Sequence, residues 1–168
     1  MADNLSAVSD SGPIIHLSEI DAAKAFNIFK ELVIPNEVSR ETKNFRIPSI
    51  RIMQLNQKHK DITKFLAVSY NLDLGEAEAI SLCMQENIKI LFTDDLEART
   101  IAKYYKLEVH GTIGILVKSF RAGIFTEKEV IAKLELLRTK SSLFLTKDLL
   151  DWSIKQIKEY SRRKKVRD

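Results

Sequence analysis

The stretch Ile88–Asp95 reads IKILFTDD and contains the clearest buried strand in the chain. Residues 88–92 are mostly β-branched, aliphatic or aromatic, which favours a short strand that is covered on both faces. Thr93 follows, and Asp94 and Asp95 then stand just beyond the end of the strand. An apolar strand that ends in carboxylates predicts a buried parallel sheet with a polar site at its edge.

Other short apolar runs repeat this pattern along the chain. We expect strands at Leu5–Ser9, Leu32–Ile34 and Leu107–Val109, and the stretch Ile47–Leu55 leaves a further strand open. Stretches with helical spacing separate these strands, and we expect helices at Ile14–Phe29, Asn36–Asn44, Asp61–Asn71, Glu76–Gln85, Asp95–Tyr105, Thr112–Ala122, Thr126–Lys140 and Leu145–Tyr160. Strands that alternate with helices predict an α/β fold with a parallel sheet of four to five strands.

Length and composition indicate one globular domain. The chain has 168 residues, of which 45% are hydrophobic and 30% charged, and this balance argues against disorder. Because no linker or repeat interrupts the pattern, we expect a single domain over residues 1–157, with a helical extension at 126–157. The single cysteine, Cys83, excludes an internal disulfide and fits a reducing compartment. No apolar stretch approaches the roughly 20 residues of a membrane span, so we expect a cytoplasmic protein without a membrane partner.

The positive charge of the chain is concentrated near its C-terminal end. The formal net charge is +4, and the last eight residues alone include five lysines and arginines. We expect residues 158–168 to form a flexible basic tail. Such a tail is either a solvated end or an arm that contacts phosphates.

Acidic residues follow two of the expected strands. Asp10 comes directly after Leu5–Ser9, and the pair Asp94 and Asp95 follows Ile88–Phe92. Ligands of open α/β sheets bind outside the carboxyl ends of the strands, so these carboxylates lie where a site is expected. The alternative is structural, since Asp is also common at turns and helix N-caps.

Two helices add a carboxylate each. At about 100° per residue, Glu76 falls between Ile80 and Cys83 on the apolar side of its helix, where an unpaired carboxylate is costly, whereas Glu78 is expected to face water. Its place in the first turn leaves a helix-dipole role open. Glu41 lies nearer the apolar side of its short helix than Glu37, which is a weaker signal.

Together these residues suggest a metal centre. Clustered carboxylates repel one another and need a cation to remain ionised, and hard oxygen ligands suit Mg²⁺ or Mn²⁺ rather than zinc. Such an ion can deprotonate a water and stabilise charge on a phosphoryl group, which favours phosphodiester hydrolysis.

Several motifs resemble the PIN-domain nucleases, and in particular the branch close to the toxin nucleases of prokaryotic toxin–antitoxin pairs. The resembling stretches are residues 7–15 (AVSDSGPII), 34–41 (IPNEVSRE), 74–80 (LGEAEAI), 91–99 (LFTDDLEAR) and 111–116 (GTIGIL). Their order and spacing over about residues 5–125 carry the resemblance, since no single motif decides it.

The resemblance implies a three-layer α/β/α sandwich and a metal-dependent endoribonuclease that cuts single-stranded RNA and leaves 5′-phosphate and 3′-hydroxyl ends. It implies one or two Mg²⁺ or Mn²⁺ ions, a homodimer and, for toxin members, inhibition by a small antitoxin protein.

Carried over to this chain, the resemblance assigns the catalytic acids to Asp10, Glu41, Glu76 and Asp95. The metal ligands are Asp10, Glu76 and one or both of Asp94 and Asp95, since the Thr-x-Asp pattern favours Asp95 and strand-end geometry favours Asp94. Ser11, Thr93 and Arg99 are expected to neighbour the site, where Arg99 holds a carboxylate or phosphate or else forms a surface salt bridge.

Two other functions compete with the nuclease. A non-catalytic PIN-like scaffold could bind RNA or protein, although no acidic position of the pattern is lost here. A phosphoacceptor signalling domain also clusters acids at strand ends, but here the acidic pair follows a later strand and no acceptor Asp stands out. No nucleotide-binding glycine motif is present, so we expect no nucleotide cofactor.

Overall fold

The computed structural model describes residues 3–45, 47 and 49–167. At its centre lies a sheet of five strands, and each neighbouring pair is parallel. The strands are β1 (Asp3–Ser9), β2 (Phe29–Pro35), β3 (Ile50–Met53), β4 (Ile90–Phe92) and β5 (Glu108–His110). They lie in the order β3-β2-β1-β4-β5. The stretch that the sequence left open therefore contains an edge strand, β3.

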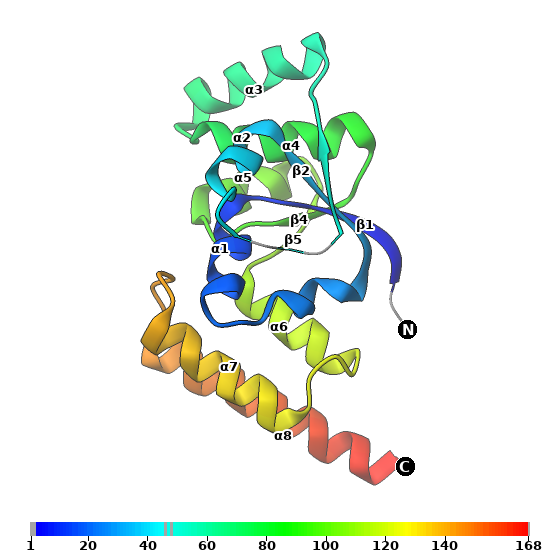
Figure 1. The fold of residues 1–168 in the computed structure, drawn as a ribbon, viewed down its shortest axis with the longest axis vertical. Helices are drawn as coiled ribbons and strands as arrows, with labels where there is room; N and C mark the ends of the chain where they lie inside the picture. The colour runs from blue at the N-terminus through cyan, green and yellow to red at the C-terminus, as the bar shows by residue number, and fades with distance from the viewer. Residues whose placement is uncertain (1–2, 46, 48, 168) are drawn as a thin grey trace.

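Helices cover both faces of this sheet (Figure 1). They are α1 (Ser11–Glu19), the 3-10 helix η1 (Ala23–Ile28), α2 (Asn36–Glu41), α3 (Gln57–Tyr70), α4 (Leu74–Glu86), α5 (Leu96–Tyr104), α6 (Thr112–Arg121), α7 (Glu127–Lys140) and α8 (Lys147–Arg167). The predicted three-layer α/β/α sandwich with a parallel sheet is confirmed.

Alternate residues of each strand build two separate cores. Ala7 of β1 and Phe92 of β4 face a core that is completed by α1, η1, α6, α7 and α8. Val8 and Leu91 face the other core, beneath α3, α4 and α5. Because successive strand side chains point to opposite faces, a strand buried on both sides needs apolar residues throughout. This is why the central strands are almost uninterrupted apolar runs.

The strand order reverses between β1 and β4. From β1 the chain builds outward through β2 and β3, and it then returns to the other side of β1 to form β4 and β5. The connections therefore leave in opposite directions from the carboxyl ends of β1 and β4, which opens a crevice at that edge. Asp10 follows β1 and Asp94 follows β4, so the fold brings these two segments to the same place.

The prediction of one helix over Ile14–Phe29 is wrong beyond residue 19. The α-helix ends at Glu19, Asp21 takes a left-handed backbone with φ 51°, and a 3-10 helix follows. Lys133 of α7 holds this turn, since its Nζ donates to the carbonyl oxygens of Ile20 (2.8 Å) and Asp21 (2.9 Å). The buried residues of the 3-10 segment have a spacing that resembles a longer amphipathic helix.

The C-terminal helices pack onto the same core as the sheet. Leu134 of α7 and Leu150 and Ile157 of α8 are buried there, so the extension over 126–157 shares its core with the rest of the chain. Helix α8 also includes residues 158–167 of the tail expected at 158–168, and the flexibility of that tail stays a prediction. Although α8 has 21 residues, no helix in the described part of the chain is long and apolar enough to cross a bilayer.

Candidate metal centre

Asp10 lies at the point where β1 passes into α1. Its backbone N–H donates to the Phe92 carbonyl oxygen at 2.8 Å, and this bond extends the pairing of β1 with β4 by one residue. As the N-cap of α1, its Oδ1 accepts from the Ser11 N–H at 2.7 Å. Its Oδ2 accepts from the Thr93 hydroxyl at 3.1 Å. The carboxylate is thus fixed in the crevice, and the residue is only 6% exposed.

Burial makes the charge of this carboxylate costly. It raises the pKa of Asp10 to about 7, and the negative charges of Asp73 and Glu41 add to the effect. The hydrogen bonds from Ser11 and Thr93 act in the other direction but do not outweigh burial. No lysine or arginine is among the main influences on this pKa.

Glu76 is the second carboxylate with a raised pKa. It sits in the first turn of α4, half-buried, and burial raises its pKa to about 7, helped by the charges of Asp73, Asp95 and Asp10. The helical pattern predicted that Glu76 faces the core, and the structure shows that its side chain is partly buried. Glu76 also closes a capping box, since its Oε2 accepts from the Asp73 N–H at 2.9 Å and its own N–H donates to Asp73 Oδ1 at 2.8 Å.

Asp73 is the acidic residue that sequence reasoning missed. Its charge raises the pKa of both Asp10 and Glu76, so it borders the same cluster. The signal that could have revealed it is the spacing Asp73-x-x-Glu76, a capping box that brings two carboxylates together at the start of a helix.

Glu41 and Asp95 stand at the exposed rim of the cluster. Glu41 ends α2, and its carboxylate lies against Gly75, where an added Cβ would come within 3.0 and 3.1 Å of its two oxygens. Asp95 is the N-cap of α5, and its Oδ1 accepts from the Ala98 N–H at 2.8 Å. Its own N–H donates to the Thr93 hydroxyl at 3.3 Å. Thr93 therefore contacts both Asp10 and Asp95.

Asp94 turns away from this cluster. It accepts hydrogen bonds from the Thr112 N–H and hydroxyl and lies 2.7 Å from Nδ1 of His16. Burial would raise the pKa of Asp94, but these hydrogen bonds outweigh it and hold the pKa below its usual value. A Cβ on Gly111 would meet its Oδ1 at 2.7 Å, so glycine is needed for this close approach. Asp94 thus joins the end of β4 to α1 and α6.

The three expected neighbours have different places. Ser11 contributes its backbone N–H to Asp10, and buried Thr93 links the carboxylates as described. Arg99 lies on the Asp94 side, with Nη1 3.2 Å from the position that a Cβ on Gly111 would take. In the described ranges no carboxylate forms an ion pair with Arg99, so its guanidinium is available to an anion from outside.

Glu78 also has a place that the helical pattern did not predict. We expected it to face water, but its Oε2 accepts from the Glu37 N–H at 2.9 Å, at the start of α2. Helix α4 packs against α2 as well as α3 and the sheet, so few of its positions face solvent.

The cluster fits a divalent cation in charge and in ligand type. Asp10 and Glu76 are hard oxygen ligands whose raised pKa values show that a nearby positive charge would stabilise their ionised forms. Within the described ranges, no three acidic, His or Cys side chains already converge closely enough to hold an ion. The exposed side chains of Glu41 and Asp95 would therefore complete a shell around the two inner carboxylates.

A family model described as a PIN domain matches residues 6–159. The chain belongs to the PIN-domain family. PIN domains are generally metal-dependent nucleases, so the carboxylate cluster has the chemical character that the family requires. The match includes every acidic residue of the cluster and leaves the last turns of α8 outside. No curated protein and no solved structure matches the chain.

Proposed function

We propose that this PIN domain is an endoribonuclease that hydrolyses phosphodiester bonds of single-stranded RNA with Mg²⁺ or Mn²⁺. The observation that carries the proposal is Asp10, a buried carboxylate at the β1–β4 crevice whose pKa rises to about 7 beside Glu76. A carboxylate placed so unfavourably for its own charge is typical of a functional site. The family and the sequence motifs support the same reading.

The residues have distinct proposed tasks. Asp10 and Glu76 would hold the metal, which when bound supplies positive charge for the phosphoryl oxygens and lowers the pKa of a water. Asp95 and Glu41, at the exposed rim, would complete the ligand set and accept protons as the phosphodiester is cut. The Thr93 hydroxyl fixes the Asp10 carboxylate by donating a hydrogen bond to it, and the same hydroxyl accepts a hydrogen bond from the Asp95 N–H.

Asp94 and Arg99 would act around the centre rather than in it. Because Asp94 already accepts from Thr112 and contacts His16, we assign the metal-facing role of the acidic pair to Asp95. Arg99 would hold a phosphate next to the cleaved bond, since no carboxylate among the described residues pairs with its guanidinium.

The substrate is tested by offering one sequence in several forms. Labelled single-stranded RNA, duplex RNA and single-stranded DNA are incubated with the protein and Mg²⁺, Mn²⁺ or EDTA. We expect internal cleavage of the single-stranded RNA only, abolished by EDTA, with 5′-phosphate and 3′-hydroxyl product ends. Faster cleavage of DNA would contradict the RNA assignment, and 2′,3′-cyclic phosphate ends would contradict attack by water.

The family resemblance also supports a toxin role, a homodimer and a small antitoxin partner. If this role is correct, expression of the protein should arrest growth, and Asp10→Asn should relieve the arrest. Light scattering tests the homodimer. Unimpaired growth with an active enzyme would contradict the toxin role alone.

A further inference from the structure

The last turns of α8 project from the body of the protein. Up to Tyr160 the helix is anchored, since the Tyr160 ring packs against Phe120 with centroids 5.5 Å apart and lies beneath the Arg121 guanidinium at 5.3 Å. Residues 162–167 are all exposed. We call residues 155–167, which comprise this exposed end and the anchored residues 155–160 before it, the basic arm.

The net positive charge of the protein comes from this arm. It contains seven lysines and arginines and one acidic residue, Glu159. Since the whole chain has a formal charge of +4, the remainder has a net charge of −2. Cations near a helix C-terminus stabilise the helix by interacting with its dipole, but that effect is limited to the last turn and needs only one or two charges. The arm therefore contains more positive charges than the stability of the helix explains.

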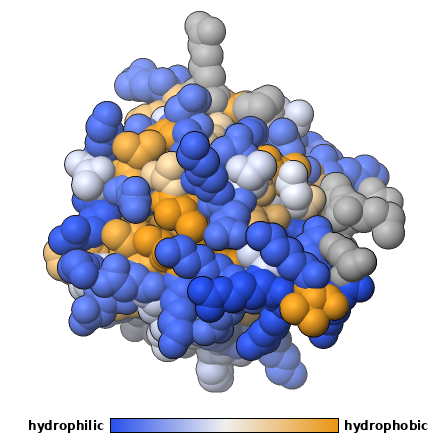
Figure 2. Space-filling model, turned by 90° about the horizontal axis from the view of Figure 1, so that it is seen from below, coloured by the Kyte–Doolittle hydropathy of each residue, from blue (hydrophilic) through white to orange (hydrophobic). Residues whose placement is uncertain are grey.

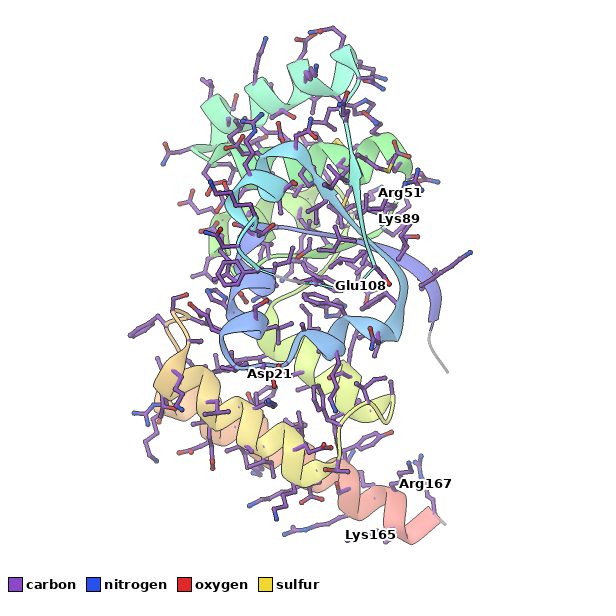
Figure 3. The ribbon with its side chains drawn as sticks, viewed as in Figure 1. Asp21, Arg51, Lys89, Glu108, Lys165 and Arg167 are labelled. Carbon is purple, nitrogen blue, oxygen red and sulfur yellow. The ribbon has the colours of Figure 1, made fainter. Side chains whose placement is uncertain are left out.

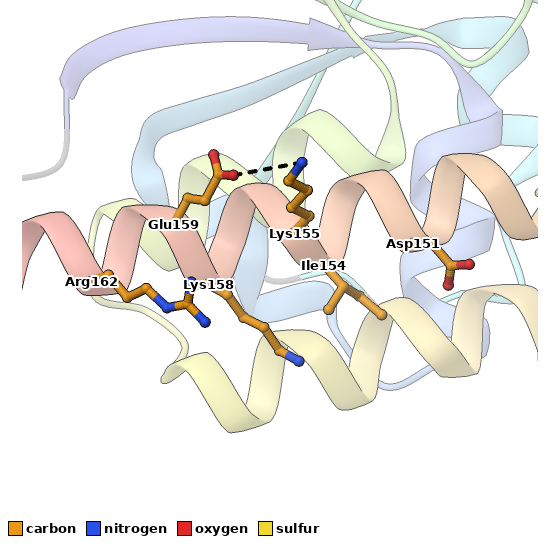
Figure 4. Close-up of a pocket in the computed structure, with 6 residues that line it drawn as sticks. All are labelled: Asp151, Ile154, Lys155, Lys158, Glu159 and Arg162. Atoms are coloured by element: carbon orange, nitrogen blue, oxygen red, sulfur yellow. Dashed lines mark ion pairs between the residues drawn. The ribbon is translucent and has the colours of Figure 1, made fainter.

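The cations are available to an outside anion. Glu159 pairs with Lys155 at 4.0 Å, and along the described chain no carboxylate pairs with Lys158 or Arg162. These two residues are one helical turn apart and help to line an open hollow of about 230 Å³ on α8 (Figure 4). Two acidic residues, Asp151 and Glu159, also line this hollow, but each already pairs with a lysine.

The exposed end of the arm and the carboxylate cluster lie on opposite sides of the molecule. Figure 3 shows Lys165 and Arg167 on the side of Arg51, Lys89 and Glu108, which stand where strands β3, β4 and β5 begin. The carboxylates stand where the strands end. An anion held by the arm is thus held away from the proposed cleavage site.

We infer that the basic arm is a second RNA-binding site, which holds the phosphate backbone of a long single strand outside the active site. Charges point to all sides of residues 161–167, and Val166 is the lone apolar residue there, so no apolar stripe is available for a lipid surface or a protein groove. Seen from below, hydrophilic side chains surround a patch of apolar ones (Figure 2). A regularly charged polyanion fits this distribution, and such contacts read no bases.

The inference concerns binding and stands whether or not the carboxylate cluster cleaves RNA. The test uses the full chain in the Asp10→Asn background, which keeps the RNA intact. Affinity for fluorescent single-stranded RNA of about 30 and about 6 nucleotides is measured at several salt concentrations for Lys158→Gln/Arg162→Gln. The matched control is Lys60→Gln/Lys64→Gln on α3, which removes the same charge from the opposite end of the molecule.

We expect the arm variant to bind the long RNA at least about tenfold more weakly at low salt, with the slope of log K against log salt reduced by about 1.4. The control variant should keep both values, and both proteins should bind the short RNA alike. Equal losses in the two variants, or no loss in the arm variant, would overturn the inference. So would unchanged RNA binding with weakened binding to phosphatidylserine vesicles, because the arm would then serve a membrane.

Discussion

The hydroxyl of Thr93 donates a 3.1 Å hydrogen bond to Oδ2 of Asp10, across 83 residues of sequence. This bond joins the ends of β4 and β1, the two strands at which the sheet reverses its order. It fixes the direction of a carboxylate whose charge burial disfavours. The crevice therefore holds the Asp10 carboxylate in place although its ionised form lowers the stability of the folded protein. This is expected if a bound cation offsets the negative charge.

Replacing Asp10 by Asn should make the metal-free protein more stable at high pH. The pKa of Asp10 is raised from 3.8 to about 7, so its contribution favours the folded state below pH 4 and is lost as pH rises through 7. Above pH 8 the ionised carboxylate costs about 4 kcal/mol, which Asn, with the same shape and no charge, avoids. Urea unfolding in EDTA at pH 4, 6 and 8 measures this. A difference between the two proteins that does not change with pH would contradict it.

Metal should stabilise the protein more at pH 8 than at pH 5. Asp10 and Glu76 both have pKa values raised to about 7, so at pH 5 both carboxyl groups are protonated and neutral, and a metal ion must displace their protons in order to bind. Mn²⁺ at about 100 times its Kd should add about 2.7 kcal/mol to the unfolding free energy at pH 8. Thermal unfolding with Mn²⁺ or EDTA tests this, and Asp10→Asn should remove most of the gain. Equal stabilisation of wild type and variant would place the metal elsewhere.

Loss of the Asp94 carboxylate should mainly lower stability, whereas loss of the Asp95 carboxylate should mainly lower the cleavage rate. Asp94→Ala leaves the Thr112 and His16 donors without their acceptor and should lower the unfolding free energy by about 3 kcal/mol. Because the pKa of Asp94 is lowered, this contribution is present at neutral pH and lost as pH falls below 3.8. Asp95→Ala removes an N-cap, which costs about 1 kcal/mol.

Cleavage should show the reverse order. We expect Asp95→Ala to lose at least about 100-fold in rate, while Asp94→Ala keeps its rate within about tenfold where it is folded. Denaturant unfolding and cleavage of both variants at one temperature test the pair. A larger rate loss in Asp94→Ala would move the metal ligand to that residue.

Gly75→Ala should affect activity without harming the fold. The new Cβ would come within 3.0 Å of the Glu41 carboxylate, whose exposed side chain must then shift by a few tenths of an ångström. Since Gly75 is helical, alanine there should leave stability equal or raise it by up to about 1 kcal/mol. We expect cleavage to fall about tenfold.

Gly114→Ala is the matched control for that substitution. Gly114 is also helical, and a Cβ there would meet His110 at an ordinary 3.4 Å, away from the carboxylates. Cleavage by Gly114→Ala should equal that of wild type. If both alanine variants lose activity alike, the contact between Gly75 and Glu41 has no specific role.

The fold was largely predictable because its signals are local. An apolar run such as Ile90–Phe92 and the carboxylates after β1 and β4 are visible in the sequence, and parallel strands bring such ends to one edge. The long helix expected beyond Glu19 failed because a distant lysine, Lys133, holds the turn that ends it. Nothing near residue 20 reports that contact.

The partners of the site residues were harder to predict than their positions. The choice between Asp94 and Asp95 depends on His16 and Thr112, which lie 78 and 18 residues away from Asp94 in the sequence. Glu78 was expected to face water because a helical pattern does not show that α2 covers that side. Asp73 was overlooked although the spacing Asp73-x-x-Glu76 indicates a capping box, because that spacing does not show that Asp10 lies nearby.

The rate of metal-dependent RNA cleavage by Asp10→Asn, measured beside wild type at pH 8 in Mn²⁺, tests the central claim most directly. The variant keeps the shape of the side chain and the hydrogen bond from Ser11, so its fold should be intact. We predict that the rate falls at least about 100-fold while the protein remains as stable as wild type or more so. Cleavage at the wild-type rate by the folded variant would contradict a metal centre built on Asp10.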